Sequence, residues 1–143
     1  MINSIKESLS NGKPTIAECG GFMYLHNRLT KKDGLSYEMV GAIDGNCYQT
    51  SKLQRFGYIT LNSEKDNLIT KKGEKIKAHE FHYWESSNCG NDFTAEKNDG
   101  RSWKCCHANN IIYAGFPHIN FYSNLNIPAS FIRKCLEFGE TNV

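Results

Sequence analysis

The stretch Pro14-Thr15-Ile16-Ala17-Glu18-Cys19-Gly20-Gly21-Phe22-Met23-Tyr24-Leu25 combines a short apolar strand, a cysteine and a pair of glycines that opens a helix. A strand that turns sharply into a helix holds the residue at the bend in a strained backbone, and small neighbours let its side chain stand clear. Cys19 occupies this bend. The first amides of the following helix lack partners within it, so they favour a thiolate and predict a lowered pKa for Cys19. The stretch predicts an activated nucleophile, although a cysteine that only packs fits the same residues.

The composition is that of one ordinary globular domain. The chain has 143 residues, with 17 basic and 15 acidic side chains and a formal net charge of +2. This near balance gives no electrostatic footprint for nucleic acid or for an anionic membrane surface. No apolar run approaches the roughly 20 residues that a membrane-spanning helix needs, and the first residues do not resemble a secretory signal. We therefore expect a cytoplasmic protein with no nucleic-acid or membrane partner.

Cysteine and histidine spacing gives little support for a metal site. Without a signal peptide, the six cysteines, at positions 19, 47, 89, 105, 106 and 135, are interpreted as reduced thiols. No Cys-x-x-Cys pair occurs, and adjacent cysteines on a strand project in opposite directions. The spacing of His79 and His82 differs from the His-Glu-x-x-His of zinc peptidases, and residues three apart on a strand face opposite ways. The sequence therefore predicts no metal, with one face of this strand lining a cleft and the other packing.

The order of predicted elements is that of an α/β domain with a mixed sheet, in which antiparallel strands extend a parallel core. The pattern predicts helices over residues 2–10 and 20–29 and a closing helix from about Pro128, with the apolar stripe Phe131, Cys135 and Phe138. Strands are predicted at 14–18, 39–43, 47–50, 55–61, 75–85, 93–97, 103–107 and 111–115. A helix that feeds a strand with no earlier strand also predicts that the chain starts inside a domain.

A cysteine nucleophile needs a base, which is usually distant in sequence. Of the five histidines, His118 follows a short apolar strand and a proline. This places it at a strand end, where catalytic side chains of α/β proteins tend to lie. His26 is expected to be structural, and His107 is expected at a surface or a strand edge. Position alone therefore favours His118.

Four segments occur in an order known from one family. They are residues 17–25 (Ala-Glu-Cys-Gly-Gly-Phe-Met-Tyr-Leu), 53–58 (Leu-Gln-Arg-Phe-Gly-Tyr), 79–83 (His-Glu-Phe-His-Tyr) and 113–118 (Tyr-Ala-Gly-Phe-Pro-His). Together they resemble the C-terminal glutamine amidotransferase domain of the cobyrinate a,c-diamide synthases, of the cobyrinate/cobyrate synthase type. The resemblance runs from about residue 5 to 128. It implies a class I glutamine amidotransferase-like mixed sheet flanked by helices, truncated on its N-terminal side.

The resemblance also implies an activity. Such a domain hydrolyses glutamine and passes ammonia to a synthetase domain, which uses ATP and Mg²⁺ to amidate the a and c carboxylates of cobyrinate in cobalamin biosynthesis. The family's nucleophile falls on Cys19 and its histidine, the general acid and base, on His118. The backbone amide of Gly20 is the expected oxyanion donor. The candidates for contact with the corrinoid substrate are His79, Glu80, His82, Tyr83 and Arg55.

The sequence departs from the family in two ways. Related triad enzymes carry a glutamate two residues after the histidine and this subfamily commonly a second histidine, but Asn120 stands there, so a Cys-His dyad is predicted and what orients His118 is left open. The phosphate-binding loop of the synthetase domain and the glycine-rich oxyanion loop have no counterpart. Residues 1–143 are therefore expected to be the C-terminal portion of the amidotransferase domain, without the synthetase domain or an ATP or Mg²⁺ site. Alone, this portion is expected to be a poor glutaminase that aggregates or forms a homodimer through an open sheet edge.

Two other functions stay open from the sequence. The same domain serves other tetrapyrroles, such as hydrogenobyrinate or nickel sirohydrochlorin, in related enzymes, and the substrate is set largely by the synthetase domain. The chain also fits a non-catalytic remnant that binds a partner subunit.

Overall fold

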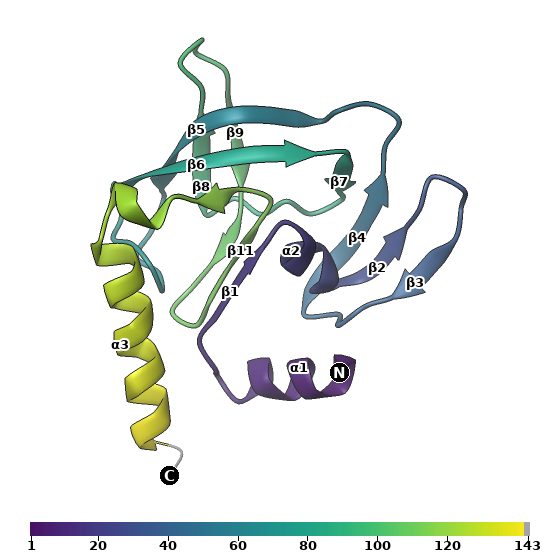
Figure 1. The fold of residues 1–143 in the computed structure, drawn as a ribbon. Coiled ribbons are helices and arrows are strands. Elements are labelled where there is room, and N and C mark those ends of the chain that lie inside the picture. Colours follow the sequence, from purple (N-terminus) through teal and green to yellow (C-terminus); the bar gives the residue numbers. More distant parts are fainter. Residues whose placement is uncertain (142–143) are drawn as a thin grey trace.

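Three small sheets make up most of the chain in the computed structural model, which describes residues 1–141 (Figure 1). They have three, five and four strands and include both parallel and antiparallel pairs. Few helices accompany them: α1 (Ile2–Ser10), the short α2 (Gly20–Tyr24), a 3-10 turn (Phe121–Ser123) and α3 (Asn126–Thr141). The predicted class, α/β with mixed sheets, is confirmed, and it is consistent with a class I glutamine amidotransferase-like fold.

The three-stranded sheet carries the strand that leads to Cys19. Its order is β1 (Thr15–Glu18), β11 (Ile112–Gly115) and β10 (His107–Ala108). β1 is parallel to β11, and β10 is antiparallel to it. β11 is an almost continuously buried run, which suits a central strand. Because Glu18 lies opposite Gly115, the ends of both strands, and the residues that follow them, meet at one edge.

The five-stranded sheet is built around one long antiparallel pair. Its order is β12 (His118–Ile119), β6 (Lys75–His82), β5 (Arg55–Ser63), β8 (Phe93–Glu96) and β9 (Ser102–Cys105). Residues along β6 alternate between exposed and buried, so Ile76, Ala78, Glu80 and His82 face the interior. This confirms the predicted division of the segment into two faces, as period-2 alternation requires. The predicted hairpin around residues 98–101 is also confirmed.

The four-stranded sheet departs from the predicted elements in several places. Its order is β3 (Ser36–Glu38), β2 (His26–Thr30), β4 (Ile43–Gln49) and β7 (Trp84–Ser86). The helix predicted over 20–29 is wrong, since α2 ends at Tyr24 and the chain continues as β2. Pairing of β2 with both β3 and β4 overrides the local helical pattern, which is weak because His, Asn and Thr are modest helix formers.

The strand predicted over 75–85 divides into two strands that belong to different sheets. β6 ends at His82 and pairs with β5, whereas β7 begins at Trp84 and pairs with β4. The carbonyl of Tyr83, at the break, accepts hydrogen bonds from the backbone N–H and the hydroxyl of Thr50. The predicted strand over 39–43 is also wrong, because β4 begins only at Ile43.

Two buried clusters hold these sheets together. The larger packs the inner face of the five-stranded sheet against β11 and Ile127 of α3. The smaller surrounds Phe22 of α2, with Ile5 and Leu9 of α1 packed on its outer side. Both clusters include residues of β11, so this strand joins the two halves of the core.

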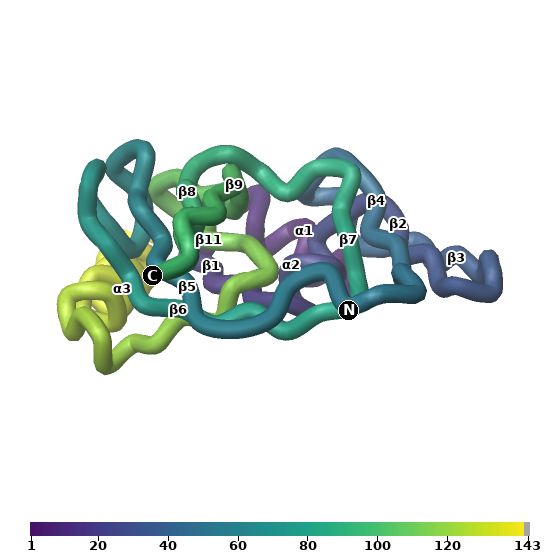
Figure 2. Tube along the Cα trace, turned by 90° about the horizontal axis from the view of Figure 1, so that it is seen from above, coloured from purple at the N-terminus to yellow at the C-terminus, as the bar shows by residue number. Residues whose placement is uncertain are grey.

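The first and the last helix lie at different places on the body (Figure 1). Both views place α3 and the β2–β3 hairpin at opposite ends of the molecule, with α1 under β1 and α2 in the first view (Figures 1 and 2). Only Ile127 of α3 is buried. In the predicted stripe, Phe131 and Phe138 are half-buried, and Cys135 is exposed.

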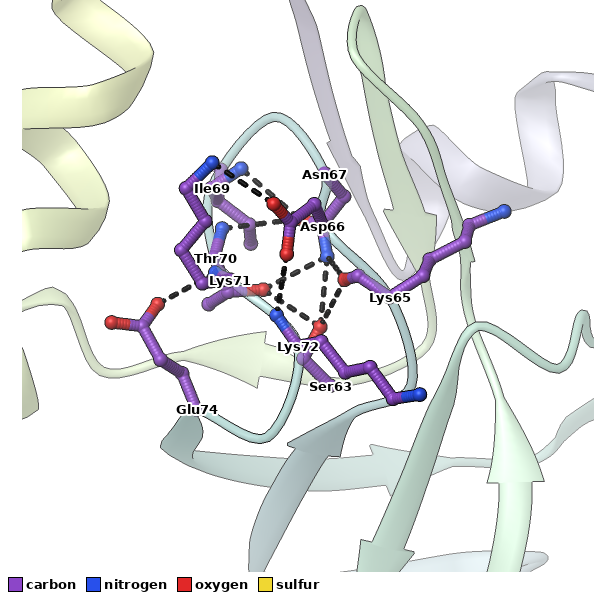
Figure 3. Close-up of polar contacts among 9 residues, drawn as sticks. All are labelled: Ser63, Lys65, Asp66, Asn67, Ile69, Thr70, Lys71, Lys72 and Glu74. Atoms are coloured by element: carbon purple, nitrogen blue, oxygen red, sulfur yellow. Dashed lines mark hydrogen bonds and ion pairs between the residues drawn. The ribbon is translucent and has the colours of Figure 1, made fainter.

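Several side chains hold the long connection between β5 and β6, and Asn67 is central among them (Figure 3). Its amide nitrogen donates to Ser63 Oγ at 2.9 Å and to Thr70 Oγ1 at 2.8 Å. Its carbonyl oxygen accepts from the backbone N–H groups of Ile69 and Thr70, both at 3.1 Å. An asparagine that satisfies nearby backbone donors is the expected centre of such a turn.

Candidate active site

Cys19 stands on a strained bend between β1 and α2. Its φ is +47° and its ψ is −104°, a combination that a non-glycine residue rarely adopts. The bend is held from both sides, because Cys19 N donates to Gly115 O at 2.8 Å and Met23 N donates to Cys19 O at 2.9 Å. Strain of this kind costs about 1–3 kcal/mol and persists only where the surroundings impose it. The strained bend that the sequence predicted is therefore confirmed.

The lowered pKa that the sequence predicted for Cys19 is wrong. Partial burial raises the pKa of the thiol, and the nearby carboxylates of Glu18 and Glu80 raise it further. A hydrogen bond from the backbone N–H of Gly20 opposes them, but it is the smaller effect compared with burial. α2 has only five residues, so its dipole is weak. The thiol is therefore neutral near pH 7 and needs a base.

The need for small residues around the bend is met at a different glycine from those predicted. A side chain at Gly20 would meet no atom within 4 Å, and one at Gly21 would meet Ala17 only at an ordinary 3.6 Å. At Gly115, however, a Cβ would lie 2.5 Å from Cys106 Sγ. The carbonyl of Gly115 also accepts the backbone N–H of Cys19. A larger residue at position 115 would push on Cys106 and displace the strand end that holds the bend.

His118 is brought to the bend by Glu18, a residue that sequence reasoning missed. Nδ1 of His118 lies 3.5 Å from Oε2 of Glu18. The other oxygen of Glu18 accepts the backbone N–H of Ile119 at 2.9 Å. One carboxylate thus ties β12 to the residue before Cys19. The sequence signal that could have pointed to Glu18 is its position directly before Cys19.

The five candidates for substrate contact do not share one surface. His79 lies on the outer side of β6, where Tyr58, His79 and His118 occupy paired positions across three strands, and Tyr83 directly follows the end of β6. The outer aromatic face, defined as Phe56, Tyr58, His79, Phe81 and Tyr83, includes ring pairs with centroids 5.2 to 5.9 Å apart. This exposed face adjoins His118.

Glu80 and His82 point the opposite way, into the interior. They are 2% and 5% exposed, so neither lines an open cleft. The ring of His82 stacks on Phe116, with centroids 4.0 Å apart and planes 8° from parallel. Burial raises the pKa of Glu80 to about 7, and burial lowers the pKa of His82. The prediction that Glu80 and His82 line a substrate cleft is therefore wrong. A ligand could reach them only through the small cavity that they line.

Arg55, the fifth candidate, lies at the end of β5 between two hollows. Its guanidinium carbon is 4.9 Å from the centre of the Trp103 ring. It lines an open hollow of about 570 Å³ together with Gln54 and Lys97, and it also borders the cavity of Glu80 and His82. Alternation along β5 could not predict this position of Arg55. Its neighbour Trp103 belongs to β9, which is joined to β5 only through β8.

The remaining histidines and Asn120 have structural contacts. His26 is fully buried and contacts Phe22 O at 3.0 Å and Ser86 Oγ at 2.7 Å, which agrees with the structural role predicted for it. His107 is half-buried on β10, an edge strand, with Nε2 3.1 Å from Asn88 O. The side chain of Asn120 accepts the N–H of Tyr122 and caps the 3-10 turn.

The cysteines are all free thiols, and no group of three or more metal-binding side chains lies together in the region that the structure describes. Within residues 1–141, no helix has the length and apolar character needed to cross a membrane.

The comparison with protein families decides the identity of this domain. A sequence model described as the CobB/CobQ-like glutamine amidotransferase domain matches residues 1–125. The chain belongs to this family. The strained cysteine, and the histidine that contacts the residue before it, therefore lie in a CobB/CobQ-like glutamine amidotransferase domain.

Three curated proteins similar to this chain carry the name cobyrinate a,c-diamide synthase. The relative from Caldanaerobacter subterraneus subsp. tengcongensis is 38% identical over 142 residues, which is 97% of this chain and 31% of the relative. The relative from Fusobacterium nucleatum is 40% identical, over 87% of this chain and 28% of its own length. The relative from Picrophilus torridus is 39% identical, over 92% of this chain and 28% of its own length. The chain thus spans less than a third of the length of these relatives.

Proposed function

We propose that this chain is the glutaminase part of a cobyrinate a,c-diamide synthase, in which Cys19 is the nucleophile and His118 the general acid and base. One observation carries the proposal: the cysteine stands on a bend with φ of +47°, and the histidine is tied to the residue directly before it. Family membership and the names of the relatives supply the substrate class, glutamine.

The first step is proton transfer from Cys19 to His118. Because burial and two carboxylates raise the pKa of the thiol, a standing thiolate is disfavoured and the sulfur must lose its proton to a base as it attacks. The sulfur then bonds to the side-chain amide carbon of glutamine. The backbone N–H of Gly20, which already faces the sulfur, is placed to donate to the oxyanion.

His118 then returns the proton to the leaving nitrogen, and ammonia departs from a γ-glutamyl thioester. Water attacks this thioester with His118 now acting as the base, which releases glutamate and restores the thiol. This cycle uses no group beyond the cysteine, the histidine and a backbone amide.

Glu18 is proposed as the positioning residue for His118. A carboxylate that accepts the Nδ1–H of an imidazole leaves Nε2 free for proton transfer and fixes the ring's orientation. The 3.5 Å separation and the second bond to Ile119 N support this role. The wider superfamily carries a glutamate two residues after the histidine, where this chain has Asn120. In this proposal Glu18 has the role of that glutamate.

The ammonia is proposed to serve ATP- and Mg²⁺-dependent amidation of the a and c carboxylates of cobyrinate. This part of the proposal rests on the printed name of the relatives, most of whose length lies outside the matched region. The present sequence contains no phosphate-binding loop, so ATP and Mg²⁺ are assigned to a synthetase domain that would be the partner of this one.

Ammonia release from glutamine by the chain tests the glutaminase directly, with Cys19→Ser as the variant. We expect glutamine-dependent ammonia that is lost in Cys19→Ser and kept in Cys135→Ser, a matched change at an exposed thiol. Since one oxyanion donor is worth roughly a hundredfold or more, a slow rate is expected from Gly20 alone. Equal release by the wild type and Cys19→Ser would contradict the proposal and favour a non-catalytic partner-binding role.

A further inference from the structure

Two buried polar atoms, Glu80 Oε2 and His82 Nε2, make no hydrogen bond within the part of the chain that the structure describes. The side chains that carry them are each only 3% exposed. Buried polar atoms are normally paired, so such an exception calls for an explanation, for instance a small molecule between them. The catalytic cycle proposed above uses neither residue.

Both atoms are hydrogen-bond acceptors. Nδ1 of His82 lies 2.7 Å from the carbonyl oxygen of Trp84, which can only accept, so Nδ1 carries the hydrogen. Burial lowers the pKa of His82 and favours the neutral ring, whose Nε2 then has a free lone pair. Oε1 of Glu80 is 4.0 Å from this Nε2, too far for a direct hydrogen bond. When Glu80 is ionised, both atoms are therefore acceptors to which no described residue donates a hydrogen bond.

The gap opens into a cavity large enough for a small molecule. Glu80 and His82 line a cavity of about 70 Å³ together with Trp103, Cys105 and Phe116. A water-sized molecule needs about 10–15 Å³ of such space. Stacking of Phe116 on His82 holds the ring in place.

The cavity is close to the reaction centre. Phe116, which forms its wall, lies two residues before His118 in the chain. The carboxylate of Glu80 is near enough to Cys19 to raise the pKa of its thiol. On its outer side, Arg55 and Trp103 border both this cavity and the open hollow of about 570 Å³. The cavity thus shares two wall residues with the surface hollow, and Glu80 couples it electrostatically to Cys19.

We propose that Glu80 and His82 form a binding site for the ammonia that leaves the thioester step, held as ammonia or as ammonium. A nitrogen with several N–H groups supplies donors to both acceptors at once, and a carboxylate complements the charge of ammonium. The inference rests on the proposed function for the source of the ligand, whereas the site itself rests on the contacts described here.

The test is a titration of the 143-residue chain, with its histidine ring nitrogens labelled with ¹⁵N, against ammonium chloride at about pH 8. At this pH Glu80, with a pKa of about 7, is mostly a carboxylate. Potassium chloride is the matched control, because K⁺ has the same charge but no N–H group. We expect a saturable shift of the His82 Nε2 resonance with ammonium and none with potassium.

Glu80→Gln is the variant, and Glu96→Gln, an exposed site on β8, is its control. Loss of a charged hydrogen bond predicts affinity for ammonium weaker by about tenfold or more in Glu80→Gln, with no change in Glu96→Gln. A shift that is absent, equal with potassium, or unchanged in Glu80→Gln would overturn the inference. Because no glutamine is present, failure of the glutaminase reaction would leave the titration result intact.

Discussion

At the scale of single residues, Cys19 joins a strained backbone to a neutral thiol. The sequence correctly predicted the strain, because the order of strand, cysteine and glycine pair is a local signal. It mispredicted the pKa, because the burial of the thiol and the approach of the distant Glu80 both arise only through the fold. In the proposed mechanism, Cys19 therefore depends on its histidine.

The pH dependence of alkylation tests this state of the thiol. Because burial, Glu18 and Glu80 raise the pKa of Cys19, the thiolate fraction should rise only above the pH at which an ordinary thiol, with a pKa of about 8.5, has titrated. Iodoacetamide labelling of Cys19, followed by mass spectrometry, should lag behind that of an unstructured cysteine peptide. Glu80→Gln removes a nearby charge and should speed labelling at about pH 8. Faster labelling of wild-type Cys19 than of the peptide would refute this account.

Replacement of Glu18 tests its role as the positioning residue. Glu18→Gln should reduce kcat for glutamine hydrolysis by at least about tenfold with little change in KM, because orientation of the base matters more than substrate binding. The ¹⁵N resonances of the His118 ring should also report a smaller fraction of the Nδ1–H tautomer. Glu38→Gln, which breaks only an exposed ion pair with Arg28, is the control. An unchanged tautomer would remove Glu18 from the mechanism.

At the scale of elements, periodicity predicted which residues of a strand face the same side. It failed to predict where an element ends because of pairing with a distant strand. The alternation along β6 and the β8–β9 hairpin follow from side-chain order and a tight-turn sequence. The early end of α2 and the break between β6 and β7 follow from pairing with β4, a contact between distant segments. For the same reason, the inward direction of Glu80 was predicted only as one of two faces.

The connection between β5 and β6 gives a stability prediction. Asn67→Ala removes the side chain that bonds Ser63, Ile69 and Thr70, so unfolding should need about 2 kcal/mol less, the scale for partly buried hydrogen bonds. Urea denaturation measures the change, and amide exchange at Ile69 and Thr70 should quicken. Asn110→Ala, at an exposed turn, should alter neither. Equal losses in both variants would show that Asn67 has no special role.

At the scale of the whole molecule, the sequence placed Cys19 and His118 after strands but did not predict their surroundings. Cys19 directly follows β1 and His118 lies three residues after β11, and the parallel pairing of these two strands puts both residues beyond the same edge of the sheet. The contact of Glu18 with β12, the inner cavity and the outer aromatic face each need two or more elements in place. Such arrangements leave no periodic trace in one sequence.

The open side of β1 gives a prediction for the chain as a whole. Among the described residues β1 pairs on one side only, with β11, and a hollow of about 490 Å³ beside it includes Ile5, Leu9 and Ile16. Exposed strand edges and apolar hollows promote association. Sedimentation should show an average mass that rises with concentration, and Thr15→Lys should reduce the rise. A monomer at every concentration would contradict the predicted association.

The most direct test of the central claim is the site of labelling by a diazo-ketone analogue of glutamine, which reacts only with a nucleophile poised at the amide position. The account predicts modification of Cys19 alone among the six cysteines, competed by glutamine and slowed at least about a hundredfold in His118→Ala. Labelling that spares Cys19, or that proceeds equally without His118, would contradict it.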